Sequence, residues 1–187
     1  HIPKSLKSVT SSYSTRYIYH ASWKSVEWGE YYNAIFSGDK NLKTVTFEDG
    51  ISEIISGLFK ETGINKIDLP SSVTKIGSSA FANSDLTTIN LPSSLSEIQD
   101  FAFANTKLKE ITIPDSVEKI GYGAFDSVKT LDKVILPTNL KEISSKTFYK
   151  TNISKITIPE SVSSIGGIAF ADTPLKSITL PNNLISI

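Results

Sequence analysis

INKIDLPSSVTKIGSSAFANSD (residues 64–85) is followed directly by LTTINLPSSLSEIQDFAFANTK (residues 86–107), and the two stretches repeat one pattern. The pattern, LxxIxLPxxLxxIGxxAFxxx, continues from residue 42 to residue 187 in steps of 22 or 23 residues. A phenylalanine marks the steps at Phe36, Phe59, Phe81, Phe103, Phe125, Phe148 and Phe170. A proline keeps the same spacing at Pro70, Pro92, Pro114, Pro137, Pro159 and Pro181. Self-similarity at such a period predicts a repeat solenoid.

Each repeat contains two short β segments and the corners between them. Apolar and polar residues alternate over residues 67–69, as in a strand with one face inward. Pro70 then has no N–H to give to a β ladder, so it suits a corner. The second apolar pair, Val73 and Ile76, is spaced by three residues, which predicts a short or bent strand. The Ala-Phe pair closes the coil, with its ring in the core.

Stacking is required because one repeat cannot bury its own apolar face. We therefore expect a repeat solenoid with a parallel β-sheet on the concave face, short second strands or turns on the other side, and little helix. Equivalent residues should form parallel ladders, about 4.7–4.9 Å apart. A charge pattern supports this register, since the residue before the second isoleucine alternates in sign through Glu53, Lys75, Glu97, Lys119 and Glu142.

The glycine after that isoleucine is not invariant. Gly77, Gly121 and Gly166 occupy the position in three repeats, and Ile55, Gln99 and Ser144 occupy it in the other three. A β-branched residue strongly disfavours positive φ, so this position cannot need a left-handed backbone in every coil.

The motif LxxIxLPxxLxxIGxxAF closely resembles the BspA-like leucine-rich repeats over residues 42–187. The resemblance implies a leucine-rich-repeat superhelix in a bacterial surface or secreted protein, in a family associated with adhesion and host-protein binding and without a shared catalytic motif. That family often carries cysteine in the turn after Ala-Phe. The corresponding residues in this chain are Asn83, Asn105, Ser127, Lys150 and Asp172.

Two regions are predicted within one continuous solenoid that is truncated at both ends. Residues 42–187 are the regular repeats, and residues 1–41 are degenerate, aromatic-rich repeats in which residues 2–9 resemble the second half of a coil. The chain contains no methionine and starts at His1, so we interpret it as an internal piece of a longer protein. The apolar residues of the last half-repeat predict end-to-end self-association through the C-terminal coil.

Composition limits the kinds of partner. The 187 residues include 19 Lys+Arg and 19 Asp+Glu, so no net charge favours nucleic acid or anionic lipid. The absence of cysteine excludes a disulfide framework. No apolar run approaches the roughly 20 residues of a membrane span. We expect an extracellular location, at the cell surface or secreted, and no membrane insertion.

Motifs of catalysis are not recognisable. His1 and His20 are the histidines of the chain, and His20 lies outside any nucleophile-elbow motif. No metal-binding pattern and no complete dinucleotide-binding glycine motif occurs. We therefore predict no catalytic, cofactor-binding or metal-binding residues and no enzymatic activity.

The best candidate binding face is the outward side of the first strands. It is polar, rich in threonine and of mixed charge, and its residues are Lys66, Asp68, Thr88, Asn90, Glu110, Thr112, Lys133, Ile135, Lys155 and Thr157. Threonine also simply favours strands.

A second candidate is an aromatic patch in the irregular N-terminal region, formed by Trp23, Trp28, Tyr31 and Tyr32. Such rings are enriched at binding hot spots. Large aromatic residues are usually buried, which favours core filling for most of them.

These observations predict a non-enzymatic segment that binds a protein on a host or neighbouring cell. Two alternatives stay open. One is a structural spacer, and the other is a module that targets carbohydrate or another substrate for an attached domain.

Overall fold

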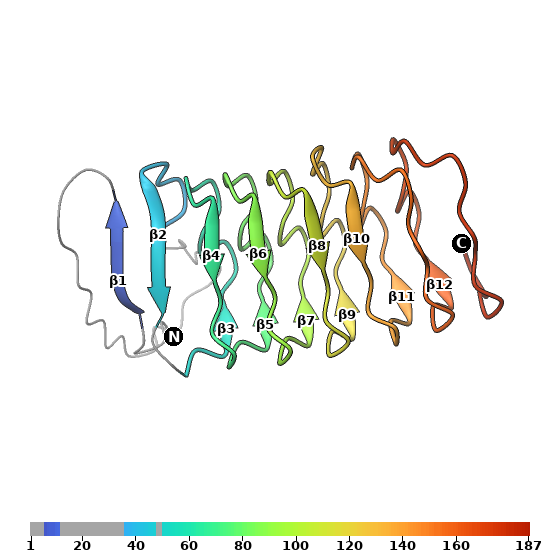
Figure 1. Cartoon of the computed structure of the whole chain (residues 1–187), viewed down its shortest axis with the longest axis horizontal. Coiled ribbons are helices and arrows are strands. Elements are labelled where there is room, and N and C mark those ends of the chain that lie inside the picture. Colours follow the sequence, from blue (N-terminus) through green and yellow to red (C-terminus); the bar gives the residue numbers. More distant parts are fainter. Residues whose placement is uncertain (1–5, 12–35, 48–49) are drawn as a thin grey trace, which may run out of the picture.

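The computed structural model describes residues 6–11, 36–47 and 50–187, of which residues 6–11 are described by their backbone. The chain winds into a solenoid whose coils follow one another along the long axis (Figure 1). The described residues form twelve β-strands and contain no helix. The predicted fold class is confirmed, with parallel strands stacked from coil to coil.

The first strand of each coil lies where apolar and polar residues alternate. These long-row strands are β2 (Leu42–Phe47), β4 (Lys66–Asp68), β6 (Thr88–Asn90), β8 (Glu110–Thr112) and β10 (Lys133–Ile135). Their central side chains point into the coil and the flanking ones point to solvent, as in the exposed–buried–exposed pattern of β4. The proline then makes a corner, because its carbonyl accepts the N–H three residues later, as Pro70 does from Val73 at 3.1 Å.

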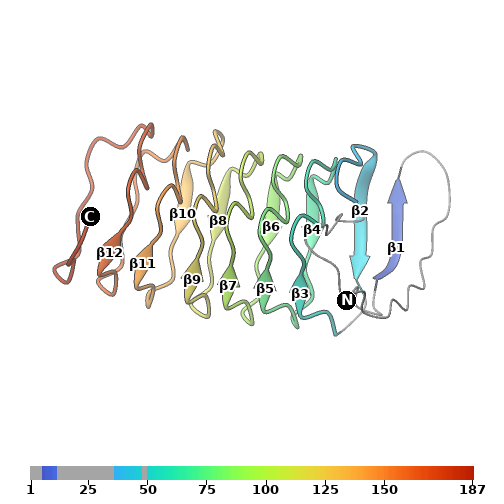
Figure 2. The same ribbon diagram turned by 180° about the vertical axis from the view of Figure 1, so that it is seen from behind.

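The second strand of each coil is only two residues long, as its irregular spacing predicts. These short-row strands are β3 (Glu53–Ile54), β5 (Lys75–Ile76), β7 (Glu97–Ile98), β9 (Lys119–Ile120), β11 (Glu142–Ile143) and β12 (Ser164–Ile165). Strands β3, β5, β7 and β9 form one four-stranded parallel sheet, and β11 pairs with β12. They run in a row along one edge, which is visible from behind in Figure 2.

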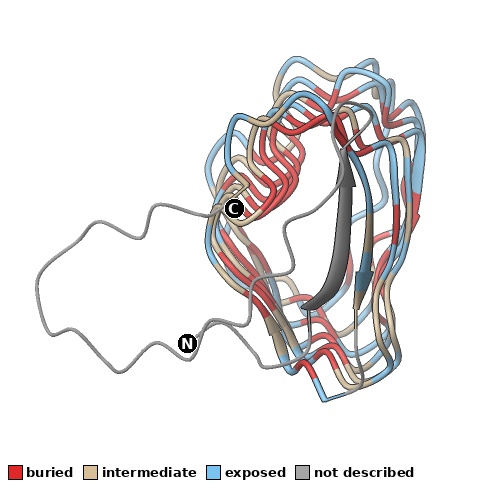
Figure 3. Cartoon of the chain, turned by 90° about the vertical axis from the view of Figure 1, so that its left-hand side faces the viewer, coloured by how far each residue is buried: buried red, intermediate tan, exposed pale blue. Residues whose placement is uncertain are grey.

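The core is a column of phenylalanine rings inside the coils. Ring centroids from Phe59 to Phe170 are 5.3–5.5 Å apart, and Phe36 lies 6.0 Å from Phe59. The five middle rings are fully buried, and the two end rings are half-buried. The end-on view in Figure 3 shows buried residues lining the inside of the coil and exposed ones outside it. The predicted stack of seven rings is confirmed.

The alternating charges lie in register on the short-row strands. The Lys75 Nζ is 3.2 Å from the Glu53 Oε1, and the Lys119 Nζ is 3.3 Å from the Glu97 Oε1. Each of these lysines therefore pairs with the glutamate of the preceding coil, as the sequence predicts. Glu142, the last member of the predicted ladder, forms no ion pair among the described residues, and its strand β11 does not pair with β9.

Replacing Lys119 by glutamate should place two carboxylates side by side at Glu97. We expect a loss of about 0.2–1 kcal/mol in the free energy of unfolding, because like charges on adjacent strands repel. The effect should shrink in high salt, since these side chains are partly exposed. Urea unfolding at low and high salt measures it. Exposed Lys129, without an ion pair in the described structure, supplies the control Lys129→Glu. Equal losses in the two variants would contradict the ladder.

Left-handed backbone occurs at two positions of every coil, two residues before and two residues after each core phenylalanine. The first position is occupied by Gly57, Ser79, Phe101, Gly123, Lys146 and Ile168. The second is occupied by Glu61, Asn83, Asn105, Ser127, Lys150 and Asp172. Gly77, Gly121 and Gly166 are not left-handed, which agrees with the prediction that their position does not need a left-handed backbone in every coil. A Cβ on any of the three would instead lie under 3 Å from backbone of the preceding coil.

The N-terminal end differs from the prediction. Strand β1 (Leu6–Ser11) runs antiparallel to β2, with Val9 opposite Val45 and Thr10 opposite Thr44. A further stacked coil would have given a parallel strand, so the interpretation of residues 2–9 as half of a repeat is wrong for this strand. An antiparallel strand can form hydrogen bonds with the backbone N–H and C=O groups at the open edge of β2 as well as a parallel one can. The division at residue 42 stays a prediction.

The C-terminal coil presents apolar side chains to solvent. Ser186 bridges to Ser164 in the parallel sense, while Ile185 and Ile187 are 87% and 83% exposed. Self-association through this coil stays a prediction.

Candidate binding face and groove

The residues predicted for the binding face all lie outward on the long row, and every one of them is exposed. Two ion pairs cross this surface. The Lys66 Nζ lies 3.6 Å from the Asp68 Oδ2, and the Lys133 Nζ lies 3.3 Å from the Glu110 Oε2. The face is therefore accessible, polar and of mixed charge, as the sequence predicts.

The long-row strands pair two by two and do not form one continuous sheet. Strand β4 pairs with β6, and β8 pairs with β10. The next segment of the row, residues 155–157, is not a strand, and no backbone hydrogen bond joins residues 155–158 to β10 in the described structure. On the short row the same two coils remain paired through β11 and β12. The same two coils are also joined along the turn of the core phenylalanines, where the Phe148 N–H donates to the Ala169 carbonyl at 2.9 Å. The interruption between them is therefore confined to the long row.

A groove of about 600 Å³ lies where the long-row ladder is interrupted. It is lined by Asp132, Lys133, Val134, Ile135, Leu136, Thr138, Lys155, Ile156, Thr157, Pro159 and Glu160. Four predicted face residues, Lys133, Ile135, Lys155 and Thr157, are among them. Ile135, whose side chain is 50% exposed, adds apolar surface that no other outward residue of strands β4, β6 and β8 provides.

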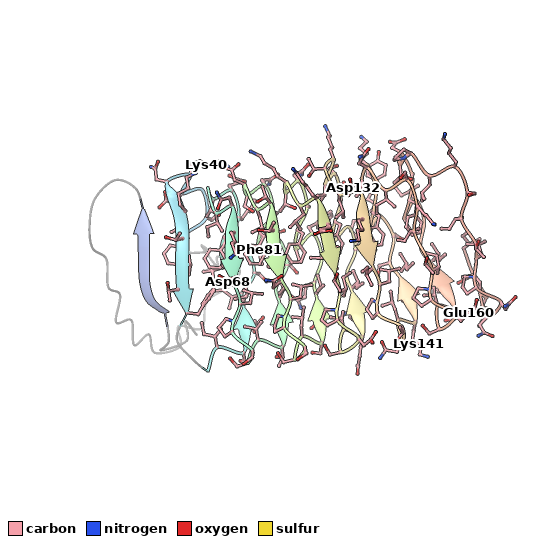
Figure 4. The ribbon with its side chains drawn as sticks, in the orientation of Figure 1. Lys40, Asp68, Phe81, Asp132, Lys141 and Glu160 are labelled. Atoms are coloured by element: carbon pink, nitrogen blue, oxygen red, sulfur yellow. The ribbon has the colours of Figure 1, made fainter. Side chains whose placement is uncertain are left out.

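Charges of both signs surround the apolar part of the groove. Figure 4 labels Asp132 in the upper part of the solenoid and Glu160 in the lower part, in the next coil. The Lys133 charge is already paired with Glu110, whereas Lys155 and Asp132 form no ion pair among the described residues. A concave surface with an apolar floor and a few charged groups is typical of a binding site.

The corner beside the groove is held by a carboxylate. Asp115 Oδ1 accepts the N–H of Thr138 at 2.7 Å and its hydroxyl at 3.0 Å. These hydrogen bonds hold the pKa of Asp115 below its ordinary value, because they stabilise the charged form. Asp115 is therefore ionised at neutral pH and positions the groove wall, which is a structural role.

The other predicted residues lie outside the groove. Lys66, Asp68, Thr88 and Asn90 belong to strands β4 and β6, and Glu110 and Thr112 belong to β8. The aromatic patch of Trp23, Trp28, Tyr31 and Tyr32 and the histidine His20 lie outside the described residues.

Metal-binding clusters were sought in the same part of the chain. No group of three or more His, Asp or Glu side chains there is arranged to hold a metal ion. Nor does any described segment form a helix long and apolar enough to span a bilayer.

The sequence did not reveal the groove itself. Repeat periodicity treats every coil as equivalent, so it cannot indicate at which coils the ladder opens. One signal was present, because Ile135 is an apolar residue in a column otherwise occupied by threonine, asparagine and aspartate.

Comparison with known proteins agrees with this architecture. The model of the BspA type leucine-rich repeat region matches residues 5–131 and 96–187, with six copies. The crystal structure of the pneumococcal vaccine antigen PcpA has a TM-score of 0.64 and 32% identity, over 71% of this chain and 36% of PcpA. No curated protein matches the chain.

Two further solved structures are bacterial leucine-rich repeat proteins. A leucine-rich repeat protein from Bacteroides ovatus is 28% identical with a TM-score of 0.53, over 65% of this chain and 38% of that one. A leucine-rich cell surface protein from Faecalibacterium prausnitzii is 28% identical with a TM-score of 0.52, over 69% of this chain and 42% of that one.

The chain thus spans less than half the length of these three solved structures. The family match covers nearly every residue, and it agrees with the coil length, the phenylalanine column and the paired rows of strands. The chain belongs to the BspA-type leucine-rich repeat family.

Proposed function

We propose that this chain is a non-enzymatic, protein-binding segment of a bacterial cell-surface or secreted protein, and that its partner lies on a host or neighbouring cell. Family membership supports the location, since one similar structure is a cell surface protein and another is a vaccine antigen. Leucine-rich repeat solenoids suit binding because their stacked strands present an extended surface.

The groove between β10 and residues 155–157 carries the proposal. It joins apolar surface around Ile135 to the charges of Lys155 and Asp132 within an otherwise polar face. Protein interfaces commonly combine an apolar centre with a polar rim. We therefore place the centre of the binding site there.

The chemistry of the groove favours a short extended peptide segment with an apolar side chain between charged ones. The apolar side chain would cover Ile135, an acidic group would pair with Lys155, and a basic group would pair with Asp132. Both ionic groups of the protein are available for this, because neither is in an ion pair with another described residue.

Selection of a displayed library of random short peptides against the chain tests this proposal. Selected peptides should lose about tenfold or more in affinity for Ile135→Asp and for Lys155→Gln, because central interface residues carry most of the binding energy. Fluorescence anisotropy with labelled peptides gives the Kd. Aspartate is compatible with this position of the coil, since Asp68 occupies it on β4.

Matched controls lie on the same face. Asn90→Asp changes the position equivalent to Ile135, and Lys66→Gln changes the position equivalent to Lys155, both outside the groove. Binding to these variants should stay within about twofold of the parent, because distant sites act independently. If the groove variants bind as tightly as the parent, the site lies elsewhere. If the library yields no peptide for the parent, the spacer alternative is favoured.

A further inference from the structure

A second surface lies on the turn that carries the core phenylalanines. Five side chains from three consecutive coils, Phe101, Tyr122, Lys146, Tyr149 and Lys150, form what we call the Tyr–Lys strip. None of them lines the groove or belongs to the long-row face. The proposed function therefore makes no use of them.

Aromatic rings and ammonium groups alternate along the strip. Phe101 and Tyr122 meet edge to face, with ring centroids 5.2 Å apart. The Lys146 Nζ lies 5.8 Å from the Tyr122 ring and 5.5 Å from the Tyr149 ring, so this ammonium sits between two aromatic groups. The Lys150 Nζ lies 4.9 Å from the Tyr149 ring. The three distances from a lysine Nζ to a tyrosine ring are in the range of cation–π attraction.

The strip is built at a cost in backbone conformation. Phe101 and Lys146 have φ values of 55° and 60°, at the position that is glycine at Gly57 and Gly123. Bulky residues are disfavoured in this region, although Ile168 adopts the same conformation outside the strip, so the conformation belongs to the coil and not to the strip alone. Gly123 also makes room for the strip, since a Cβ there would lie 2.6 Å from the Phe101 ring. Folding alone does not require these residues, because serine occupies the same position at Ser79.

The carboxylates near the strip do not come close enough to form ion pairs with its lysines, and Asp172 and Asp126 are only minor causes of the raised pKa of Lys150. Neither Lys146 nor Lys150 forms an ion pair within the described residues, whereas Lys75, Lys107 and Lys119 all do. The Tyr149 hydroxyl is the main cause that raises the pKa of Lys150 above its ordinary value. The Lys150 ammonium is therefore charged at neutral pH. Tyr122 is 39% exposed, so the strip is open to solvent.

We propose that the Tyr–Lys strip binds an acidic polysaccharide, that is, a chain of sugar rings carrying carboxylates. Each unit of such a polymer presents an apolar C–H face, which stacks on an aromatic ring, and an anionic group, which pairs with an ammonium. The alternation of ring and lysine along the strip matches this repeat. An acidic protein segment matches it less well, because protein hot spots favour enclosed, fully desolvated pockets and the strip is half-exposed.

Binding of hyaluronan and polygalacturonate oligosaccharides, measured by isothermal titration calorimetry, tests the proposal. At least one of the two should bind with an affinity that falls as salt is added, because the lysine contribution is electrostatic. Neutral dextran should not bind. Tyr122→Ser and Lys146→Gly should each weaken binding by about tenfold or more, since each removes one stacking or ionic partner.

The two substitutions use residues that the fold accepts at these positions. The position of Tyr122 is occupied by serine in three other coils, at Ser56, Ser78 and Ser145. The position of Lys146 is occupied by glycine in two other coils, at Gly57 and Gly123. Lys146→Gly removes a side chain from a left-handed residue, so its melting temperature should be no lower than that of the parent. Lost binding in a protein of undiminished stability would exclude a merely structural role.

Lys141→Ser is the matched control. It removes the same charge from an exposed lysine outside the strip, which is labelled in Figure 4. Three other coils carry serine at the equivalent position, namely Ser52, Ser96 and Ser163. It should leave binding unchanged, as should the groove variant Lys155→Gln, which separates this proposal from the proposed function. The proposal is overturned if neither oligosaccharide binds, or if the strip variants bind like the parent. It is also overturned if polyglutamate binds at least as tightly as both oligosaccharides, because the ligand would then be an acidic peptide.

Discussion

Replacing Phe103 by alanine is expected to lower the free energy of unfolding by about 3–5 kcal/mol, the range found for other buried phenylalanines. Phe103 is fully buried and stacks between Phe81 at 5.5 Å and Phe125 at 5.3 Å. Its removal opens a cavity in the middle of the column and ends the ring contacts with Phe81 and Phe125. Since the stability of a solenoid depends on nearest-neighbour contacts, two coil interfaces weaken at once.

Urea unfolding followed by circular dichroism measures this loss, and Phe101→Ala is the control. Phe101 is in the same coil, but its side chain is only half-buried. We expect less than half the destabilisation, because burial of apolar surface sets the size of the effect. If Phe103→Ala is as stable as the parent, or if Phe101→Ala costs as much, the column is not what holds the coils together.

The column was predictable because a solenoid converts sequence period into spatial contact. The residue that packs on Phe103 is its own equivalent one repeat earlier or later, so spacing alone identifies Phe81 and Phe125 as its neighbours. The same reasoning placed Lys75 beside Glu53 and Ile76 beside Ile98. Ordinary globular folds lack this property, because their contacts join unrelated segments.

The ends of the solenoid were not predictable in the same way. The repeat period of the sequence predicts contacts only for a coil that has a similar coil on both sides. Strand β1 pairs with β2 at the end of the solenoid, where it can run antiparallel. Hydrogen bonding satisfies a strand edge in either direction, so the spacing of Leu6 and Val9 does not indicate which direction the strand takes.

Binding surfaces depend on departures from the repeat, which a consensus averages out. Ile135 stood out in the sequence, but the opening of the ladder beside it depends on how the coils of β10 and residues 155–157 stack. The Tyr–Lys strip was missed because its members fall in different columns. Tyr122 lies in a column otherwise occupied by serine, aspartate and glycine, and the left-handed position of Lys146 becomes apparent only from the backbone.

Glycine alternates with larger residues at one position of the stack, and the structure supplies the reason. The order is Ile55, Gly77, Gln99, Gly121, Ser144 and Gly166, so each larger residue has glycine as its neighbour. A Cβ on Gly77 would lie 2.5 Å from the backbone nitrogen of Ser56 and 2.9 Å from the carbonyl oxygen of Ile54. These are fixed backbone atoms, and the Gly77 N–H donates to that same oxygen at 2.7 Å.

Gly77→Ala is therefore expected to destabilise the protein by about 1–3 kcal/mol, the range for overpacking of a tightly packed site. The added methyl group must push apart two coils that are joined by the β3–β5 ladder. Gly167→Ala should act in the opposite direction. A Cβ on Gly167 meets nothing within 4 Å, and the residue is not left-handed. The alanine should stabilise by about 0.4–1 kcal/mol, because it restricts the unfolded chain.

The two glycine variants carry the same chemical change, so composition and charge cannot explain a difference of sign between them. Urea midpoints of Gly77→Ala, Gly167→Ala and the parent, measured side by side, give the comparison. Hydrogen exchange at the N–H of residue 77 should rise in the first variant, since its bond to Ile54 must lengthen. If Gly77→Ala is as stable as the parent, the coils do not approach this closely, and the alternation of glycine needs another cause.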